Sequence, residues 1–354
     1  MSGFNERIEK IRKLAREKGL ETIVLRLNPN LAWAVAGRVH VAMTLDQACF
    51  DLVIDEHSVT AVVDAIEAPR LLAEEFLTGV SVEIVEWWED REPKLPTGQK
   101  TGSDKPGGNR VDLASDLEQL RRSLVAEDAE RLRKIGSQAA VAMGQAMREI
   151  SADDREIDVA GRITKSLWSA DLDIVYIGVG GESRLPLFKH VLPTAAPIGN
   201  RVVASICARR KGLIVSITRI ATFGELSEQH YSEYLSILEV EAAMFDATKV
   251  GAPFSQAIHA AISAYPVNGF AENEWTKHHQ GGPTGYLPRD WTAHRGSSRL
   301  IAVNQAVAWN PTGKGWKVED TLITHEAGVE LITNDKSWPA LTVAGRSRPD
   351  ILRR

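Results

Sequence analysis

Residues 127–149 read EDAERLRKIGSQAAVAMGQAMRE. Apolar residues recur in this stretch at intervals of three and four, among them Leu132, Ile135, Ala139 and Met143, and the spacing predicts one long amphipathic helix. The segment 151–156 then starts a second helix, and strand-like runs follow it. This order of a long helix, a shorter helix and strands is the pattern that decides the predicted fold.

The same order of elements recurs in the second half of the chain. A long helix is predicted at about 228–248, a break at Gly251-Ala-Pro253, and a second helix at about 254–264, before a region that contains His278. Two successive units of this kind indicate an internal duplication, although side-chain identity between them is weak. A duplicated α/β unit commonly packs as two halves, so we expect a site between the halves.

The first part of the chain has a different pattern. It opens with a predicted helix at about 4–18, and strand-like runs follow at 21–25, 50–54 and 80–85, with a helix-like segment at 67–76. This alternation predicts a small α/β domain with a mixed sheet. The segment 93–110 is rich in proline and glycine and is predicted to be a loop with at most one short strand. We expect two domains, residues 1–120 and residues 121–354.

Composition narrows the class of protein. The net charge of -5 offers no basic surface for nucleic acid, and no basic amphipathic stretch or long apolar run indicates a membrane partner. The N-terminus reads as a charged helix and not as a signal peptide. Two cysteines, Cys49 and Cys207, form no disulfide framework, which fits a reducing cytoplasm. Cys207 lies in an apolar run, so we expect it in the core.

Four motifs carry a resemblance to a known family. They are Val202–Cys207 with Val215–Arg219, the sequence His-His-Gln-Gly-Gly-Pro-Thr-Gly at 278–285, Trp309–Pro311, and Val318–Thr321. Together they resemble the creatinase/aminopeptidase P/methionine aminopeptidase family. The resemblance implies an α/β fold with a small N-terminal creatinase-like domain and a C-terminal pita-bread domain, which is a duplicated α/β unit with a pseudo-two-fold axis. It also implies a homodimer.

Metal-dependent members of that family hold two divalent ions with carboxylates and a histidine. The Thr218-Arg219 dipeptide sets the register of the comparison, and the ligand positions then fall on Ser205, Ser216, Gly282, Asn310 and Glu319. Only Glu319 could still bind a hard cation strongly, because hydroxyls and an amide do not neutralise two dications. We therefore expect no metal and no other cofactor. Glycine at position 282 is expected to leave room for substrate.

At the positions where family members place residues for proton transfer, this chain departs from the family less than at the metal-ligand positions. The resemblance places catalytic histidines at His190 and His278, and puts Arg289 where another histidine stands. Adjacent histidines on a strand point to opposite faces, so only His278 of the pair 278–279 is expected to face the site. With His190 as general base, His278 as a second proton carrier and Glu319 as an orienting carboxylate, we expect a metal-independent hydrolase or lyase. The expected reaction is hydrolysis of a C–N bond in an amino-acid-like or amidine-like small molecule, while elimination and isomerisation stay open.

Several further residues are expected to bind the substrate. Arg289 and Arg38 would anchor an anionic group, Tyr286 would line a pocket for a planar or apolar molecule, and the neutral groups of the former ligand positions would donate or accept hydrogen bonds. Each of these residues also has a purely structural interpretation, such as a core histidine or a solvated arginine. Two other functions remain as alternatives: a non-catalytic pseudo-peptidase that binds peptide or protein, and a metallo-aminopeptidase with a rearranged ligand set.

Overall fold

The computed structural model describes residues 3–41, 45–75, 79–105 and 107–354. The chain divides into two compact units, one of residues 1–128 with 211–213, and one of residues 129–210 with 214–354. No helix in the described part of the chain is long and apolar enough to cross a membrane.

The first unit is built on one mixed sheet of six strands. The strand order is β4-β3-β2-β1-β5-β6, with β1 antiparallel to β2 and parallel to β5. The expected N-terminal helix is confirmed as α1, and it buries Phe4, Ile8, Ile11 and Leu14. The elements of this unit are α1 (Gly3–Lys18), β1 (Thr22–Leu27), α2 (Asn28–Val35), β2 (Gln47–Asp55), β3 (Val59–Asp64), α3 (Ala68–Glu74), β4 (Ser81–Val85), β5 (Thr101–Ser103), β6 (Val111–Asp112) and α4 (Ala114–Arg122), with a 3-10 turn at Glu92–Lys94.

Four elements of the first unit were not expected from the sequence, namely α2, β3, β6 and α4. Helix α2 begins with a proline in its first turn and ends at Ala36, which has a left-handed backbone. Strand β3 follows β2 after a short turn in which the carboxylate of Asp55 accepts hydrogen bonds from the amides of His57 and Ser58. The end of the helix predicted at 67–76 lies partly outside the described residues, because Phe76 is not among them.

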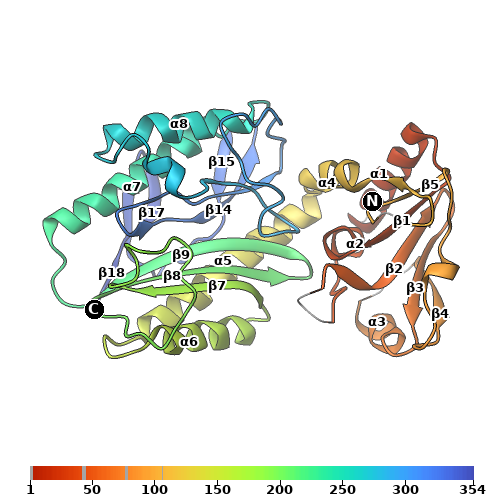
Figure 1. Cartoon of the computed structure of the whole chain (residues 1–354), viewed down its shortest axis with the longest axis horizontal. Coiled ribbons are helices and arrows are strands. Elements are labelled where there is room, and N and C mark those ends of the chain that lie inside the picture. Colours follow the sequence, from red (N-terminus) through yellow and green to blue (C-terminus); the bar gives the residue numbers. More distant parts are fainter. Residues whose placement is uncertain (1–2, 42–44, 76–78, 106) are drawn as a thin grey trace. The chain divides into compact units, whose positions relative to one another are not determined.

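The second unit contains the two similar halves that the sequence pattern predicts. In the first half, α5 (Ala126–Arg148) and α6 (Glu156–Ser169) lie against the sheet of order β18-β9-β8-β7, and in the second half α7 (Glu228–Ala247) and α8 (Phe254–Val267) lie on the far side of the sheet β10-β11-β14-β15 (Figure 1). The strands are β7 (Asp173–Gly181), β8 (Arg201–Arg210), β9 (Leu213–Thr222), β10 (Gly281–Pro283), β11 (Ala306–Trp309), β12 (Thr312–Gly313), β13 (Trp316–Lys317), β14 (Asp320–His325), β15 (Gly328–Leu331), β16 (Ala340–Val343), β17 (Arg346–Pro349) and β18 (Leu352–Arg353), with a 3-10 turn at Glu274–Lys277.

Strand β9 joins the two halves. The backbone amide of Thr218 donates to the carbonyl of Glu319 at 2.9 Å, and that of Ser216 donates to the Thr321 hydroxyl at 2.8 Å. The guanidinium of Arg219 donates to the Asp320 carboxylate at 3.0 Å, and both side chains are buried. These bonds hold the segment 319–321 against β9, so residues of β8, β9 and the start of β14 meet at one place.

Candidate functional site

Side chains of β8 and β9 form the base of the site. Ser205 and Cys207 are two residues apart on β8 and therefore point to the same face, as Ser216 and Thr218 do on β9. The Ser205 and Thr218 hydroxyl oxygens are 2.8 Å apart, and the Cys207 sulfur lies 3.4 Å from the Ser216 hydroxyl. Burial, followed by the charge of Glu319, raises the pKa of Cys207 to about 11, so this thiol stays protonated and inert.

Lys317 lies at the centre of the site, although sequence reasoning did not single it out. Its Nζ donates to Ser205 Oγ at 3.1 Å and to Thr218 Oγ1 at 2.9 Å, and it forms a close ion pair with Glu319 Oε2. The side chain is only 12% exposed. The alternation of an extended segment would have found it, because residues two apart, such as Lys317 and Glu319, lie on one face.

Glu319 accepts from a second cation. Arg289 Nη2 lies 3.2 Å from Glu319 Oε1, and Arg289 Nη1 donates to the carbonyls of Gly282 and Ala308 at 3.0 and 2.8 Å. Burial alone would raise the pKa of Glu319, but the charges of Lys317 and Arg289 outweigh it and hold that pKa below its usual value. Arg289 was expected to bind an anionic group of the substrate, but in the structure its anionic partner is the carboxylate of Glu319.

Three histidines gather beside this ion network. The Nε2 atoms of His190 and His278 are 3.3 Å apart, and the rings of His278 and His279 stack with centroids 4.3 Å apart. The expectation that only His278 faces the site is wrong, because 278 and 279 precede β10 and do not follow the alternation of a strand. Burial, and then the charge of His279, lowers the pKa of His278 to about 2, and burial followed by Arg289 lowers that of His279 to about 4.

The depressed pKa of His278 predicts a stability change with pH. Above pH about 6.5 the imidazole is neutral in both states, whereas below it the unfolded chain binds a proton that the folded chain does not. When the pH falls from 7.5 to 5, the His278 imidazole should lower the free energy of unfolding by about 2 kcal/mol. This pH-dependent loss should be absent in His278→Gln. Urea denaturation in EDTA-containing buffer measures it, with His259→Gln at an exposed position as control. An unchanged difference between the two pH values in His278→Gln would contradict the assignment.

The residues at the positions that the resemblance aligns with metal ligands do not fit a two-metal cluster. A side chain at Gly282 has no space, because its Cβ would lie 2.6 Å from the Trp291 carbonyl oxygen, so the expected room for substrate there is absent. Asn310 is buried, and among the described residues its Oδ1 has no hydrogen-bond partner. The Lys317 ammonium contacts both Ser205 and Glu319, and its positive charge would oppose the binding of two dications there.

One other group of donors could hold a single transition-metal ion. His190, His278 and His279 each offer one ring nitrogen, and these atoms lie within 4.8 Å of one another. Imidazoles suit zinc or copper, but three neutral nitrogens are not the carboxylate set of the two-metal family members. The expected ligand positions and this histidine group are thus different places in the same site.

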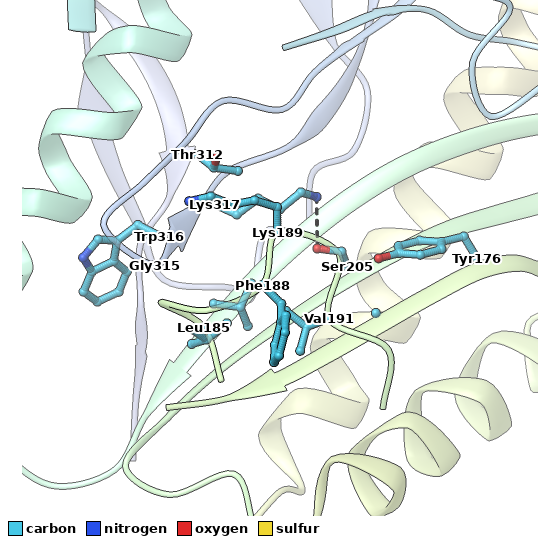
Figure 2. Close-up of a pocket in the computed structure, with 12 residues that line it drawn as sticks. Tyr176, Leu185, Phe188, Lys189, Val191, Ser205, Thr312, Gly315, Trp316 and Lys317 are labelled. Carbon is cyan, nitrogen blue, oxygen red and sulfur yellow. Dashed lines mark hydrogen bonds between the residues drawn. The ribbon is translucent and has the colours of Figure 1, made fainter. Parts of the chain in front are cut away.

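A cavity opens on the ion network. The cavity is partly open to solvent and has a volume of about 30 Å³, and its wall includes the hydroxyl of Ser205 and the ammonium of Lys317. Figure 2 shows Tyr176 with its hydroxyl directed toward Ser205. Lys189 and Val191, the chain neighbours of His190, also line the cavity. The other lining residues are Gly178, Leu185, Phe188, Val203, Thr312, Gly315 and Trp316.

Two residues expected to bind substrate, Tyr286 and Arg38, are not among the residues that line the cavity. Tyr286 is buried. Arg38 belongs to the first unit, where its backbone amide donates to the Glu75 carboxylate at 2.8 Å. Its role as an anchor stays a prediction. Tyr176 was missed by sequence reasoning, since nothing in the sequence distinguishes it from a core tyrosine.

Comparisons with known proteins address the fold. No protein-family model matches the chain, and no curated protein does. Among solved structures, the prolidase of Pyrococcus horikoshii matches with a TM-score of 0.78 at 17% identity, covering 94% of this chain and 99% of that one. The X-Pro aminopeptidase of Thermotoga maritima matches with a TM-score of 0.76 at 15% identity, covering 98% and 99%. The N-terminal domain of the FACT complex subunit SPT16 from chickpea matches with a TM-score of 0.69 at 13% identity, covering 94% and 96%.

The structural similarity extends over nearly the whole chain, and at this low sequence identity it shows the fold alone. The expected architecture, with an N-terminal α/β domain and a duplicated C-terminal domain, is confirmed. The chain has the pita-bread fold that prolidases and X-Pro aminopeptidase share.

Proposed function

We propose that this chain is a metal-independent hydrolase that cleaves a C–N bond in an amino-acid-like or amidine-like small molecule. The observation that supports it best is the position of Lys317, whose ammonium contacts Ser205 and Glu319, two of the positions where two-metal relatives keep ligands. A cation fixed by three hydrogen bonds can supply positive charge at that place without a metal. The homodimer and the cytoplasmic location remain predictions.

His190 is the proposed general base. It is the exposed member of the histidine group, and burial of the ring, followed by the charge of Lys317, lowers its pKa below the usual value. It is therefore neutral at neutral pH, as a base must be. The two Nε2 atoms, 3.3 Å apart, form a hydrogen bond when His190 Nε2–H donates to His278 Nε2. In this tautomer His190 Nδ1 carries no proton and can accept one. His278 then holds the tautomer, and its depressed pKa argues against the second proton-carrier role expected for it.

The reaction is written for an amide. His190 takes a proton from water as the hydroxide adds to the carbonyl carbon, and the carbonyl electrons move to the oxygen to form a tetrahedral oxyanion. The protonated His190 gives the same proton to the leaving nitrogen, the C–N bond breaks, and the oxyanion re-forms the carbonyl. Amide and water thus give a carboxylic acid and an amine. Glu319 holds Lys317 in position throughout, and Arg289 holds Glu319, so the role proposed for Glu319 is orienting and not proton transfer.

The histidine group supports one competing function, a hydrolase that uses a single metal ion. Its three nitrogens equal the number of protein ligands in catalytic zinc sites, which keep a fourth position open for water. The two functions differ in what removal of metal does. The pseudo-peptidase alternative has no specific contact in the site to support it, and absence of turnover would favour it.

A chelation experiment tests the proposal. Purified protein is dialysed against EDTA and 1,10-phenanthroline, and amine release is followed with a panel of small amides, amidines and dipeptides. Turnover should stay within about twofold of the untreated protein, because no step needs a Lewis acid. Elemental analysis of the same sample is the control for complete removal. Loss of turnover on chelation with recovery on adding Zn²⁺ or Mn²⁺ would sink the metal-independent mechanism.

A further inference from the structure

We infer that the hydroxyls of Tyr176 and Ser205 form an oxyanion site that binds the carbonyl oxygen of the substrate. This inference rests on the proposed hydrolase function and assigns two donors that the motif comparison did not assign this role. Both residues line the cavity, and they come from neighbouring strands, Tyr176 from β7 and Ser205 from β8. Figure 2 shows the phenol directed toward the serine hydroxyl.

The register of β7 and β8 explains why the two hydroxyls converge. Gly178 is the partner of Ser205 across the two strands, so a side chain on residue 178 would lie on the same face as Ser205, with Cβ atoms about 4.5–5.5 Å apart. The Tyr176 hydroxyl takes that space instead, because a Cβ on Gly178 would lie 2.4 Å from Tyr176 Oη. Glycine at 178 is therefore required for the tyrosine to reach the cavity beside Ser205.

The Tyr176 hydroxyl is available to a ligand. Among the described residues it has no hydrogen-bond partner, and its ring packs edge-on against His190 with centroids 6.3 Å apart. Burial, followed by the charge of Glu319, raises the pKa of Tyr176 to about 12, so the phenol keeps its proton and acts as a donor at neutral pH. The ring of the proposed base thus lies beside the ring of this donor, which itself lines the cavity.

Counting protons orients the Ser205 hydroxyl. An ammonium has three protons, and those of Lys317 have three acceptors, namely Ser205, Thr218 and Glu319. Ser205 Oγ therefore accepts from Lys317. The single Thr218 proton has two acceptors, Ser205 Oγ at 2.8 Å and Glu319 Oε2 at 3.5 Å, and the shorter contact favours donation to Ser205. In that arrangement the proton of Ser205 points into the cavity.

The arrangement places two hydroxyl donors where negative charge develops during attack by water. The Lys317 ammonium strengthens the Ser205 donor, since a hydroxyl that accepts from a cation gives its own proton more readily. Removing one donor of an oxyanion hole typically lowers kcat by about 10²–10³-fold. Such a loss appears in kcat more than in KM, because the interaction is strongest in the transition state.

Paired variants test the site by turnover. Tyr176→Phe and Ser205→Ala should each lower kcat by about 100-fold or more with KM changed little, and Ser205→Thr, which keeps a hydroxyl, should recover part of the loss. Tyr231→Phe on α7 and Ser166→Ala on α6 are the matched controls, since both lie outside the cavity lining. Circular dichroism and thermal melting establish that each variant is folded.

A binding measurement separates this inference from the proposed function. Methylphosphonate, a small tetrahedral anion, is titrated into the protein and followed by ³¹P NMR, a readout that needs no turnover. Tyr176→Phe and Ser205→Ala should each weaken its binding about tenfold or more. If no amide is hydrolysed but both variants weaken binding, the oxyanion site stands and the hydrolase function fails. If hydrolysis is found and either variant keeps wild-type kcat and methylphosphonate affinity, the inference fails and the function stands.

Discussion

Replacing Lys317 with methionine is expected to lower the free energy of unfolding by about 3–5 kcal/mol, the usual cost of removing one partner from a buried ion pair. Glu319 would remain buried with Arg289 at 3.2 Å as its remaining ion-pair partner, and the hydroxyls of Ser205 and Thr218 would each lose a donor. Urea denaturation at pH 7.5 in metal-free buffer measures the change. Removing the buried ammonium also removes its own desolvation cost, which offsets part of the change, but the cost of a buried carboxylate that keeps Arg289 and loses its closer partner dominates.

Two further variants make that result specific. Lys314→Met removes an exposed lysine that pairs with Glu233 at 3.7 Å, and it should cost no more than about 1 kcal/mol. The double variant Lys317→Met with Glu319→Gln should recover part of the stability, because both charges are gone. A loss below about 1 kcal/mol in Lys317→Met would mean that this ammonium is not held as described.

Replacing His190 with alanine is expected to lower kcat by about 10²–10⁴-fold, the contribution of a positioned general base. The side chain is exposed, so the fold should tolerate the change. His259→Ala, at an exposed position on α8, is the control. A kcat within tenfold of the wild type would remove His190 from the mechanism.

The pH profile of kcat/KM gives a second readout of the same residue. A base works when neutral, so activity should rise as pH rises through the pKa of His190 and be level above it. Burial and the charge of Lys317 lower that pKa while Glu319 raises it less. The rings of His278, His279 and Tyr176 also pack around the His190 ring. The acid limb should therefore lie below pH 6.5 in the wild type. An acid limb centred above pH 6.5 would contradict the assignment.

The helices of the second unit could be predicted closely from the sequence. Expected helices at about 127–149 and 228–248 correspond to α5 (Ala126–Arg148) and α7 (Glu228–Ala247). Long periodic segments are predictable because their apolar spacing repeats over several turns. Strand β3 and helix α2 are short, so each offers too few repeats for the same argument, and tertiary contacts decide them.

The candidate site was predictable only in part. Ser205, His190 and Glu319 were found by their positions in motifs, and the structure brings the first and last together through Lys317. Tyr176 could not be found, because a register shift between Ile174 and Tyr176 sets where its side chain meets β8. The placement of His279 beside His278 likewise depends on backbone that is neither helix nor strand.

The sequence by itself predicted the duplicated α/β architecture, since it follows from residue type and spacing along the chain, whereas the absence of a two-metal ligand set rests on the resemblance and stays a prediction. Only the tertiary structure decided that a lysine ammonium contacts two of those positions, that Arg289 holds Glu319 instead of facing the cavity alone, and that the space above Gly178 belongs to a tyrosine hydroxyl. The reason is physical. Which polar groups share protons depends on distances between strands that are far apart in sequence, and no local pattern encodes those distances.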